Sequence, residues 1–235
     1  MLEIRNLTGG YTKNHDILQD INLDIAKGDV VGIIGLNGSG KSSLAKALMN
    51  ILPYRQGTIL LNGKDVSKKS TKELSELGIS MFMQGGRVFD ELSVWENLKI
   101  AAKNEKEIIE IQKNFASLHV FKNKMDKIRA DRLSGGERSQ LALAMSVLKK
   151  PSLLVLDEPS AGLSPLAVDE IYRLLNLLRQ KYNMTIILIE QNIRRCLEFC
   201  SKIKILQNGN IAYSTENKDL KEIENIMFNN KMIVQ

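Results

Sequence analysis

A glycine-rich stretch between a predicted strand and a predicted helix constrains the fold more than any other part of the sequence. It reads Gly35-Leu36-Asn37-Gly38-Ser39-Gly40-Lys41-Ser42-Ser43. The apolar, β-branched run 30–34 before it is typical of a buried strand, and residues 44–49 after it favour a helix. Strand, glycine loop, Gly-Lys-Ser and helix together are the context of a phosphate-binding P-loop. The sequence therefore predicts a nucleotide site on an α/β core.

The chemistry of this loop suits a nucleoside triphosphate. Its glycines let successive backbone N–H groups turn inward onto phosphate oxygens, and the following helix adds about half a positive charge at its N-terminus. Lys41 would reach the β- and γ-phosphates, and Ser42 would offer its hydroxyl to Mg²⁺. A glycine turn that only links strand to helix is the alternative interpretation. The predicted phosphate-binding residues are Gly35, Asn37, Gly38, Ser39, Gly40, Lys41, Ser42 and Ser43.

Two acidic residues end a second apolar strand, which is predicted at 153–157. In open α/β sheets, ligands bind at the carboxyl ends of the strands. Asp157 is therefore placed to hold Mg²⁺ through water, and Glu158 to polarise a water that attacks the γ-phosphate. Such acids also occur as N-caps of a following helix, which is the structural alternative.

The segment Leu133-Ser134-Gly135-Gly136-Glu137 predicts a capped helix start, because Ser134 and Glu137 have the spacing of a capping box. A capping box does not explain two glycines in the first helical turn, where each costs roughly 1 kcal/mol relative to alanine. A close approach to the backbone would explain them, and a helix N-terminus is an anion site. One nucleotide does not easily reach two such termini of one domain. A dimer in which each chain caps the nucleotide of the other is therefore expected.

These three segments, in this order and spacing, resemble the nucleotide-binding subunits of ATP-binding cassette (ABC) transporters over essentially the whole chain. The resemblance implies ATP and Mg²⁺ as cofactors and an ATPase activity. It also implies a homodimer, or a heterodimer with a sister ATPase subunit, on integral-membrane permease subunits. Ser134, Gly135, Gly136 and Glu137 would then contact ATP across the dimer. The implied location is cytoplasmic, on the inner face of the cell membrane.

The same resemblance assigns roles to three residues outside these segments. Tyr11 falls where the family stacks an aromatic ring on adenine, and Gln84 falls at the glutamine that touches Mg²⁺ and reports to the permease. Gln191 stands where most members have a histidine that contacts the γ-phosphate. An exposed turn with Phe89 follows Gln84, and we expect it to fill a groove around a permease helix.

The sequence departs from the family pattern in a way that points to a subfamily. Glu137 replaces the usual final glutamine of the signature, and Ser164 stands where many members have aspartate. The segment Glu190-Gln191-Asn192, with Pro-Ser-Ala-Gly-Leu-Ser-Pro at 159–165, resembles one ATPase subunit of branched-chain amino-acid importers. An amino-acid importer is therefore the first hypothesis. A soluble ABC ATPase of a non-transport system, such as iron–sulfur cluster assembly, is the alternative.

Composition is compatible with this interpretation. The net charge of +6 is spread along 235 residues without interleaved aromatics, so nucleic-acid binding is not expected. No run approaches the ~18 apolar residues of a membrane helix, and the first residues do not favour a signal peptide. Cys196 and Cys200 share a helix face, where we expect buried, reduced thiols.

The predicted fold is α/β, a P-loop NTPase core with a mostly parallel sheet, an N-terminal antiparallel β subdomain and an inserted α-helical subdomain. The chain is predicted to be a single ABC ATPase domain, 1–235. We expect 1–90 and 151–235 to form the core, and 91–150 to form the helical subdomain that carries the signature. Strands are expected at 2–8 and 17–25, with a turn through Gly9, Gly10 and Tyr11, and residues 94 to about 129 are expected to be helical.

Overall fold

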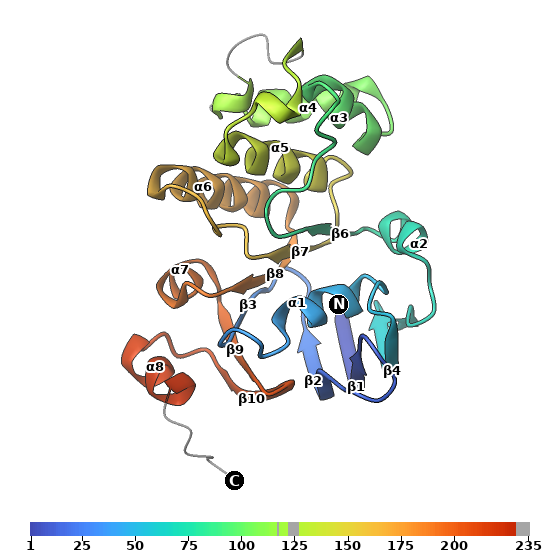
Figure 1. Ribbon diagram of the computed structural model, residues 1–235, viewed down its shortest axis with the longest axis vertical. Coiled ribbons are helices and arrows are strands. Elements are labelled where there is room, and N and C mark those ends of the chain that lie inside the picture. Colours follow the sequence, from blue (N-terminus) through green and yellow to red (C-terminus); the bar gives the residue numbers. More distant parts are fainter. Residues whose placement is uncertain (117, 122–126, 229–235) are drawn as a thin grey trace. The chain divides into compact units, whose positions relative to one another are not determined.

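The computed structural model describes residues 1–116, 118–121 and 127–228. The chain divides into two compact units, and each is described by itself below. The first unit comprises 1–74 and 186–235, and the second comprises 75–185. Helix α2 (Thr71–Glu76) crosses the boundary between them in sequence. Both units combine helices with strands, and the predicted α/β fold class is confirmed (Figure 1).

An antiparallel sheet in the first unit contains the N-terminal strands. Their order is β2-β1-β4-β5, and β1 pairs along its length with both β2 and β4. Leu2 and Ile4 of β1 are buried in alternation, as expected for a sheet with one covered face, and Leu7 is buried after a register shift in the strand. This sheet confirms the predicted antiparallel β subdomain. Its strands are β1 (Leu2–Gly10), β2 (Leu18–Ile25), β4 (Tyr54–Leu61) and β5 (Lys64–Asp65).

The predicted turn through Gly9 and Gly10 is wrong, because both glycines belong to β1. A Cβ atom at Gly9 would lie 2.4 Å from the Tyr54 carbonyl oxygen, and one at Gly10 would lie 2.1 Å from the His15 carbonyl oxygen. Glycine is needed at both positions because neighbouring backbones pass too close for a side chain, and not because the chain reverses there. The chain reverses after them, between Tyr11 and β2.

Parallel strands in the same unit carry the glycine loop. Strand β3 pairs in parallel with β8 on one side and with β9 on the other, and β10 continues the sheet antiparallel to β9. All five residues of β3 are buried, as its continuous apolar run predicts. These elements are β3 (Val30–Ile34), β8 (Thr185–Glu190), β9 (Lys202–Gln207), β10 (Asn210–Thr215), α1 (Lys41–Leu48), α7 (Ile193–Phe199) and α8 (Leu220–Phe228).

The two cysteines pack against β3. Cys196 and Cys200 are fully buried free thiols with their sulfur atoms 3.7 Å apart, which confirms the prediction. A Cβ atom at Gly32 would lie 2.2 Å from the Cys196 sulfur, so glycine is required for α7 to approach this strand. The Cys200 hydrogen bond and burial raise the pKa of the Cys196 thiol well above its usual value, which keeps this thiol protonated and inert.

The second unit joins a parallel strand pair to helices. Strand β6 pairs with β7 in register from Ile79 opposite Leu153 to Phe82 opposite Leu156. Figure 1 shows α3, α4 and α5 grouped together in green to olive. The elements are β6 (Ile79–Phe82), α3 (Val94–Ala101), α4 (Glu105–Asn114), the short 3₁₀ turns η1 (His119–Phe121) and η3 (Ala130–Arg132), α5 (Gly135–Val147), β7 (Leu153–Asp157) and α6 (Pro165–Tyr182).

The helical region predicted from 94 to about 129 is interrupted. Helix α3 ends at Ala101, and Asn104 caps a new helix by accepting a hydrogen bond from the Glu107 N–H at 3.2 Å. A cap residue in extended conformation breaks the helical path, although the charged sequence continues on both sides. Residues 117 and 122–126 of the predicted stretch lie outside the described residues.

A polar cluster fixes α4 to the end of α6. The Glu110 carboxylate accepts hydrogen bonds from the Tyr182 hydroxyl at 2.8 Å and from the Lys150 ammonium at 2.7 Å. Asn114 joins the cluster, because its amide nitrogen donates to the Tyr182 oxygen at 3.0 Å. Two helices far apart in sequence are therefore joined by several hydrogen bonds through one tyrosine.

Within the described part of the chain, no helix combines the length and the apolar character that spanning a bilayer requires.

Candidate nucleotide-binding and hydrolysis site

The glycine loop leads from the buried strand β3 into α1 in a conformation suited to anions. Gly38 and Gly40 have φ angles of +81° and +103°, which favour glycine. Helix α1 has no side-chain N-cap and no acidic residue in its first turn, whereas α3 and α5 both begin with capping boxes. No capping side chain therefore accepts a hydrogen bond from the N-terminal N–H groups of α1, which suits the binding of an anion at this helix start.

Lys41 lies folded over this loop. Its ammonium group is buried and donates hydrogen bonds to the carbonyl oxygens of Gly35 at 2.9 Å and Leu36 at 3.0 Å. A buried cation held by neutral carbonyls, close to a turn of backbone N–H groups, makes the loop strongly attractive to phosphate. The contact of Lys41 with the β- and γ-phosphates stays a prediction.

Gln191 lies at the same sheet edge as the loop. Ile34, the last residue of β3, is paired with Glu190, so Gly35 and Gln191 both follow the carboxyl ends of neighbouring parallel strands. The buried Glu190 carboxylate accepts hydrogen bonds from the backbone N–H groups of Gln191 at 3.1 Å and Asn192 at 3.4 Å. The sequence analysis assigned no role to Glu190. The signal that could have identified it is an acidic residue at the end of a buried, largely apolar strand.

Tyr11 lies beside α1. Its ring is 47% exposed, and the Lys46 ammonium donates to its hydroxyl at 2.8 Å and lies 5.0 Å from the ring centroid. The structure therefore brings Tyr11 to the helix that follows the P-loop, while its adenine contact stays a prediction.

The second unit brings together Gln84 and Glu158. The Gln84 side-chain nitrogen donates to the Glu158 carboxylate at 2.7 Å. Asp157 and Glu158 are both buried, at 4% and 6% exposure; Asp157 is the last residue of the buried strand β7 and Glu158 follows it. Glu158 has a φ angle of +48°, a conformation that costs non-glycine residues of order 1 kcal/mol and that often occurs at functional sites. These residues therefore lie together where β6 and β7 end, and their roles in hydrolysis stay predictions.

The signature segment forms a complete capping box at the start of α5. The Ser134 hydroxyl oxygen accepts from the Glu137 N–H at 3.3 Å, and the Glu137 carboxylate accepts from the Ser134 N–H at 2.9 Å. The two glycines between them differ. A Cβ atom at Gly136 would lie 3.2 Å from the Ala167 Cβ, whereas one at Gly135 would have no atom within 4 Å. Packing among the residues that the structure describes therefore gives no reason for glycine at 135.

Ser164 has a local role. Its hydroxyl oxygen accepts from the Ala167 N–H at 3.4 Å and caps α6, with Pro165 as the first helical residue. Serine and aspartate are both good N-caps, so the change from the more common aspartate preserves this helix start.

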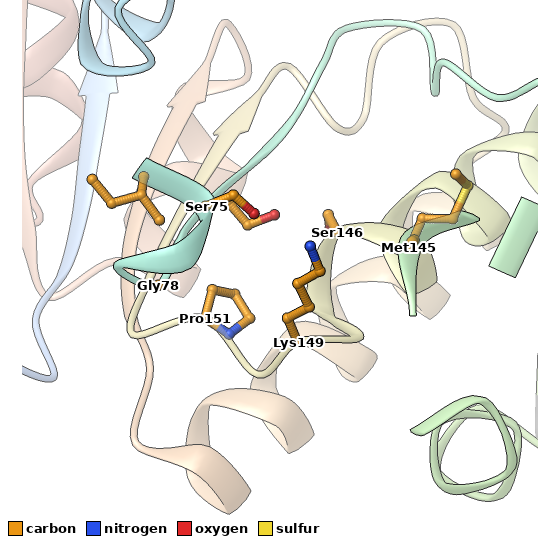
Figure 2. A pocket seen from close by; sticks show the side chains of 9 residues that line it. Ser75, Gly78, Met145, Ser146, Lys149 and Pro151 are labelled. Carbon is orange, nitrogen blue, oxygen red and sulfur yellow. The ribbon is translucent and has the colours of Figure 1, made fainter. Parts of the chain in front are cut away.

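A cavity of about 190 Å³ in the second unit lies away from Gln84 and Glu158 of the same unit (Figure 2). Gly78, Ile79 and Pro151 line it at the edge where β6 and β7 begin, whereas Gln84 and Glu158 follow the edge where these strands end. Figure 2 labels Gly78 and Pro151 together with four further lining residues, Ser75, Met145, Ser146 and Lys149. The cavity is therefore distinct from the edge of this unit that carries Gln84 and Glu158.

The model of the ABC transporter family matches residues 18–161 of the chain. The chain is 37% identical over 230 residues to the probable branched-chain amino acid transport ATP-binding protein LivF of Archaeoglobus fulgidus, and the match covers 95% of each chain. It is 32% identical over 198 residues to the high-affinity branched-chain amino acid transport ATP-binding protein BraG of Pseudomonas aeruginosa, and this match covers 83% of this chain and 84% of BraG.

Solved structures share the fold. One is the ADP conformation of an ATP-binding cassette of an ABC transporter, with a TM-score of 0.82 and 26% identity. The match covers 99% of this chain and 96% of that chain. Another, a nucleotide-free ATP-binding cassette from an ABC transporter, has a TM-score of 0.83 and 25% identity, with 100% of this chain and 97% of that chain covered.

Proposed function

Because the chain belongs to the ABC transporter family, we propose that it is the ATP-hydrolysing subunit of an importer of branched-chain or related amino acids. The observation that carries the proposal is the full-length similarity to LivF at 37% identity, together with the similarity to BraG. The Glu-Gln-Asn segment at 190–192 and the segment at 159–165 support the same subfamily.

In this proposal the loop at 35–43 holds the β- and γ-phosphates of ATP, with Lys41 as their main cationic partner. Glu158 accepts a proton from the water that attacks the γ-phosphorus, while the bond from the γ-phosphorus to the bridging oxygen of ADP breaks. Gln84 orients the Glu158 carboxylate through their 2.7 Å hydrogen bond. Gln191 positions the γ-phosphate through its amide, since a glutamine side chain both donates and accepts.

The donor set fits Mg²⁺. The proposed residues Ser42, Gln84 and Asp157 supply hydroxyl, amide and carboxylate oxygens, which are the hard ligands that this ion prefers. The buried Asp157 carboxylate at the end of β7 is the anionic member of the set. When bound, the ion would neutralise charge on the β- and γ-phosphates.

We further propose that two cassettes share each nucleotide, as a homodimer or with a sister ATPase subunit. The open space around Gly135 supports this proposal, because a backbone without a side chain at the start of α5 suits contact with a phosphate held by the partner. Ser134, Gly136 and Glu137 complete that surface.

The permease contact is proposed at the turn that follows Gln84. Phe89 is 51% exposed, yet its backbone is fixed by the fully buried side chain of Asn97. The Asn97 oxygen accepts from the Phe89 N–H at 2.8 Å, and its nitrogen donates to the Phe89 carbonyl at 3.0 Å. Next to it, Asp90 forms an ion pair with Arg138 in the first turn of α5. An apolar side chain on a backbone held this firmly suits docking to a membrane-subunit helix.

Co-purification tests the proposal. The tagged chain should bring down multispanning membrane proteins from detergent-solubilised membranes, and cells lacking the chain should lose uptake of labelled leucine or isoleucine. The unmodified chain and Lys72→Ala, a change at an exposed lysine of α2, should restore uptake, whereas Lys41→Ala should not. Recovery with soluble iron–sulfur assembly proteins, and with no membrane protein, would favour the alternative function.

A further inference from the structure

We propose that the turn at Asn208-Gly209, between β9 and β10, is a positioning element that holds the phosphate-binding loop in its anion-binding shape. The Gly209 N–H donates a hydrogen bond to the carbonyl oxygen of Ser39 at 3.0 Å. Both residues belong to the first unit. The inference concerns ATP binding and does not depend on which substrate is transported.

The Ser39 carbonyl needs such a partner. When the N–H groups of a glycine loop turn inward to phosphate, the carbonyl groups point outward into the protein. Ser39 is only 7% exposed, and a buried carbonyl without a hydrogen bond is strongly unfavourable. The Gly209 N–H satisfies this carbonyl. Because the Ser39 N–H is itself bonded to the Leu36 carbonyl at 3.1 Å, the path of the loop is fixed on both sides of this residue.

The first residues of β2 hold this turn in place. The Gly209 carbonyl accepts a hydrogen bond from the Gln19 N–H at 2.9 Å. Ile17, the residue before β2, also lies close to the loop, since a Cβ atom at Gly40 would lie 3.3 Å from the Ile17 carbonyl oxygen. The Gly209 peptide group therefore bridges the loop and the start of β2.

Only glycine fits at position 209. Its φ angle is +81°, and a Cβ atom there would lie 2.1 Å from the Ile17 carbonyl oxygen. That oxygen belongs to the backbone, so the overlap can be relieved only if the turn or the Ile17 segment moves. Either movement would shift the Gly209 N–H relative to Ser39, and the loop would lose a fixed support.

The chain contains a matched control. Asn62-Gly63 connects β4 to β5, with Leu61 paired to Lys64, as Asn208-Gly209 lies between the paired residues Gln207 and Asn210. Gly63 has a similar φ angle of +76°, but a Cβ atom there would have no atom within 4 Å. Alanine at either position meets the same backbone strain, and only alanine at 209 disturbs the loop.

The experiment compares Gly209→Ala with Gly63→Ala in the purified protein. Calorimetric titration with MgATP and MgADP should show about tenfold weaker binding for Gly209→Ala, and an affinity within about twofold of the unmodified protein for Gly63→Ala. In turnover assays, Gly209→Ala should raise KM for MgATP more than it lowers kcat. Equal nucleotide affinities for the two variants would overturn the proposal.

A second measurement applies if Gly209→Ala does not fold. In the unmodified protein, MgATP should slow hydrogen exchange at the Gly209 amide, because an ordered loop keeps the Ser39 carbonyl in place. The Gly63 amide should be unaffected. Unchanged exchange at Gly209 under saturating MgATP would contradict the proposal.

Discussion

The Gln84 side-chain nitrogen lies 2.7 Å from the Glu158 carboxylate, and this hydrogen bond joins the exit of β6 to the exit of β7. Glu158 is buried and has a left-handed backbone conformation, so its carboxylate has little freedom of its own. The chain continues from Gln84 to the exposed Phe89. A displacement of the turn at Phe89 would therefore move Gln84 and change the position of the Glu158 carboxylate, the proposed catalytic base.

Replacing that base should separate binding from hydrolysis. Glu158→Gln keeps the shape of the side chain but cannot take up a proton, so turnover should fall by about 100-fold or more while MgATP still binds. With MgATP the variant should sediment as a dimer, and with MgADP it should not. A variant that stays monomeric with MgATP would contradict the shared site, and one that hydrolyses ATP normally would contradict the role of Glu158.

Changing the docking turn should affect transport and spare the isolated subunit. Phe89→Asp places a charge on an exposed apolar residue, which should lower uptake because a charged group does not enter an apolar groove. Basal ATPase activity of the purified chain should stay the same. Phe228→Asp is the control, because Phe228 on α8 is 62% exposed. Normal uptake with Phe89→Asp would exclude this turn as the permease contact.

Gln191→His should introduce a pH dependence that the unmodified chain lacks. Glutamine does not titrate, whereas histidine changes charge near pH ~6.5. Nearby phosphates, and the buried Glu190 carboxylate beside it, would raise the pKa of the new imidazole. The turnover number at saturating MgATP should therefore show a limb between roughly pH 5.5 and 7.5 for the variant.

The control for this measurement is a protein in which His15 and His119, the two histidines of the chain, are replaced and Gln191 is kept. If this control protein already shows a limb near pH ~6.5, another group controls the step and the role given to Gln191 is wrong.

Glu110→Gln should weaken the link between α4 and α6 in a pH-dependent way. The hydrogen bonds from Lys150 and Tyr182 lower the pKa of Glu110 below its ordinary 4.5. Because the folded-state pKa is lower, the stabilisation is complete above pH 4.5 and is lost as the pH falls through the folded-state pKa. The midpoint of urea unfolding should thus be higher for the unmodified protein than for the variant at neutral pH, and this gap should close in acid.

A variant of Lys150 tests whether its contact with Glu110 causes this difference in the midpoint of unfolding. Lys150→Met removes the ammonium that contributes most to the lowered pKa of Glu110. Adding Glu110→Gln to Lys150→Met should cost less stability than Glu110→Gln costs alone, since the two residues form one interaction. Strict additivity of the two changes would show that the Lys150 contact does not stabilise the fold.

The sequence by itself determined the element types around the site and the order of the motifs. Strand β3, the glycine loop, α1, the acid-ended strand β7 and the capped start of α5 all lie where the local patterns place them. These features depend on side-chain periodicity, glycine conformation and capping, which act within a few residues of one another.

Only the tertiary structure decided which distant backbones meet. Gly9 and Gly10 were expected in a turn, yet they lie in β1 because the backbones of Tyr54 and His15 pass close to them. Asn97 was given no role, although its buried amide fixes the turn at Phe89. The contact of Gly209 with Ser39 likewise joins segments that are remote in sequence. Periodicity reports which face of an element is buried, but it does not report which backbone groups a neighbouring segment brings within hydrogen-bonding distance.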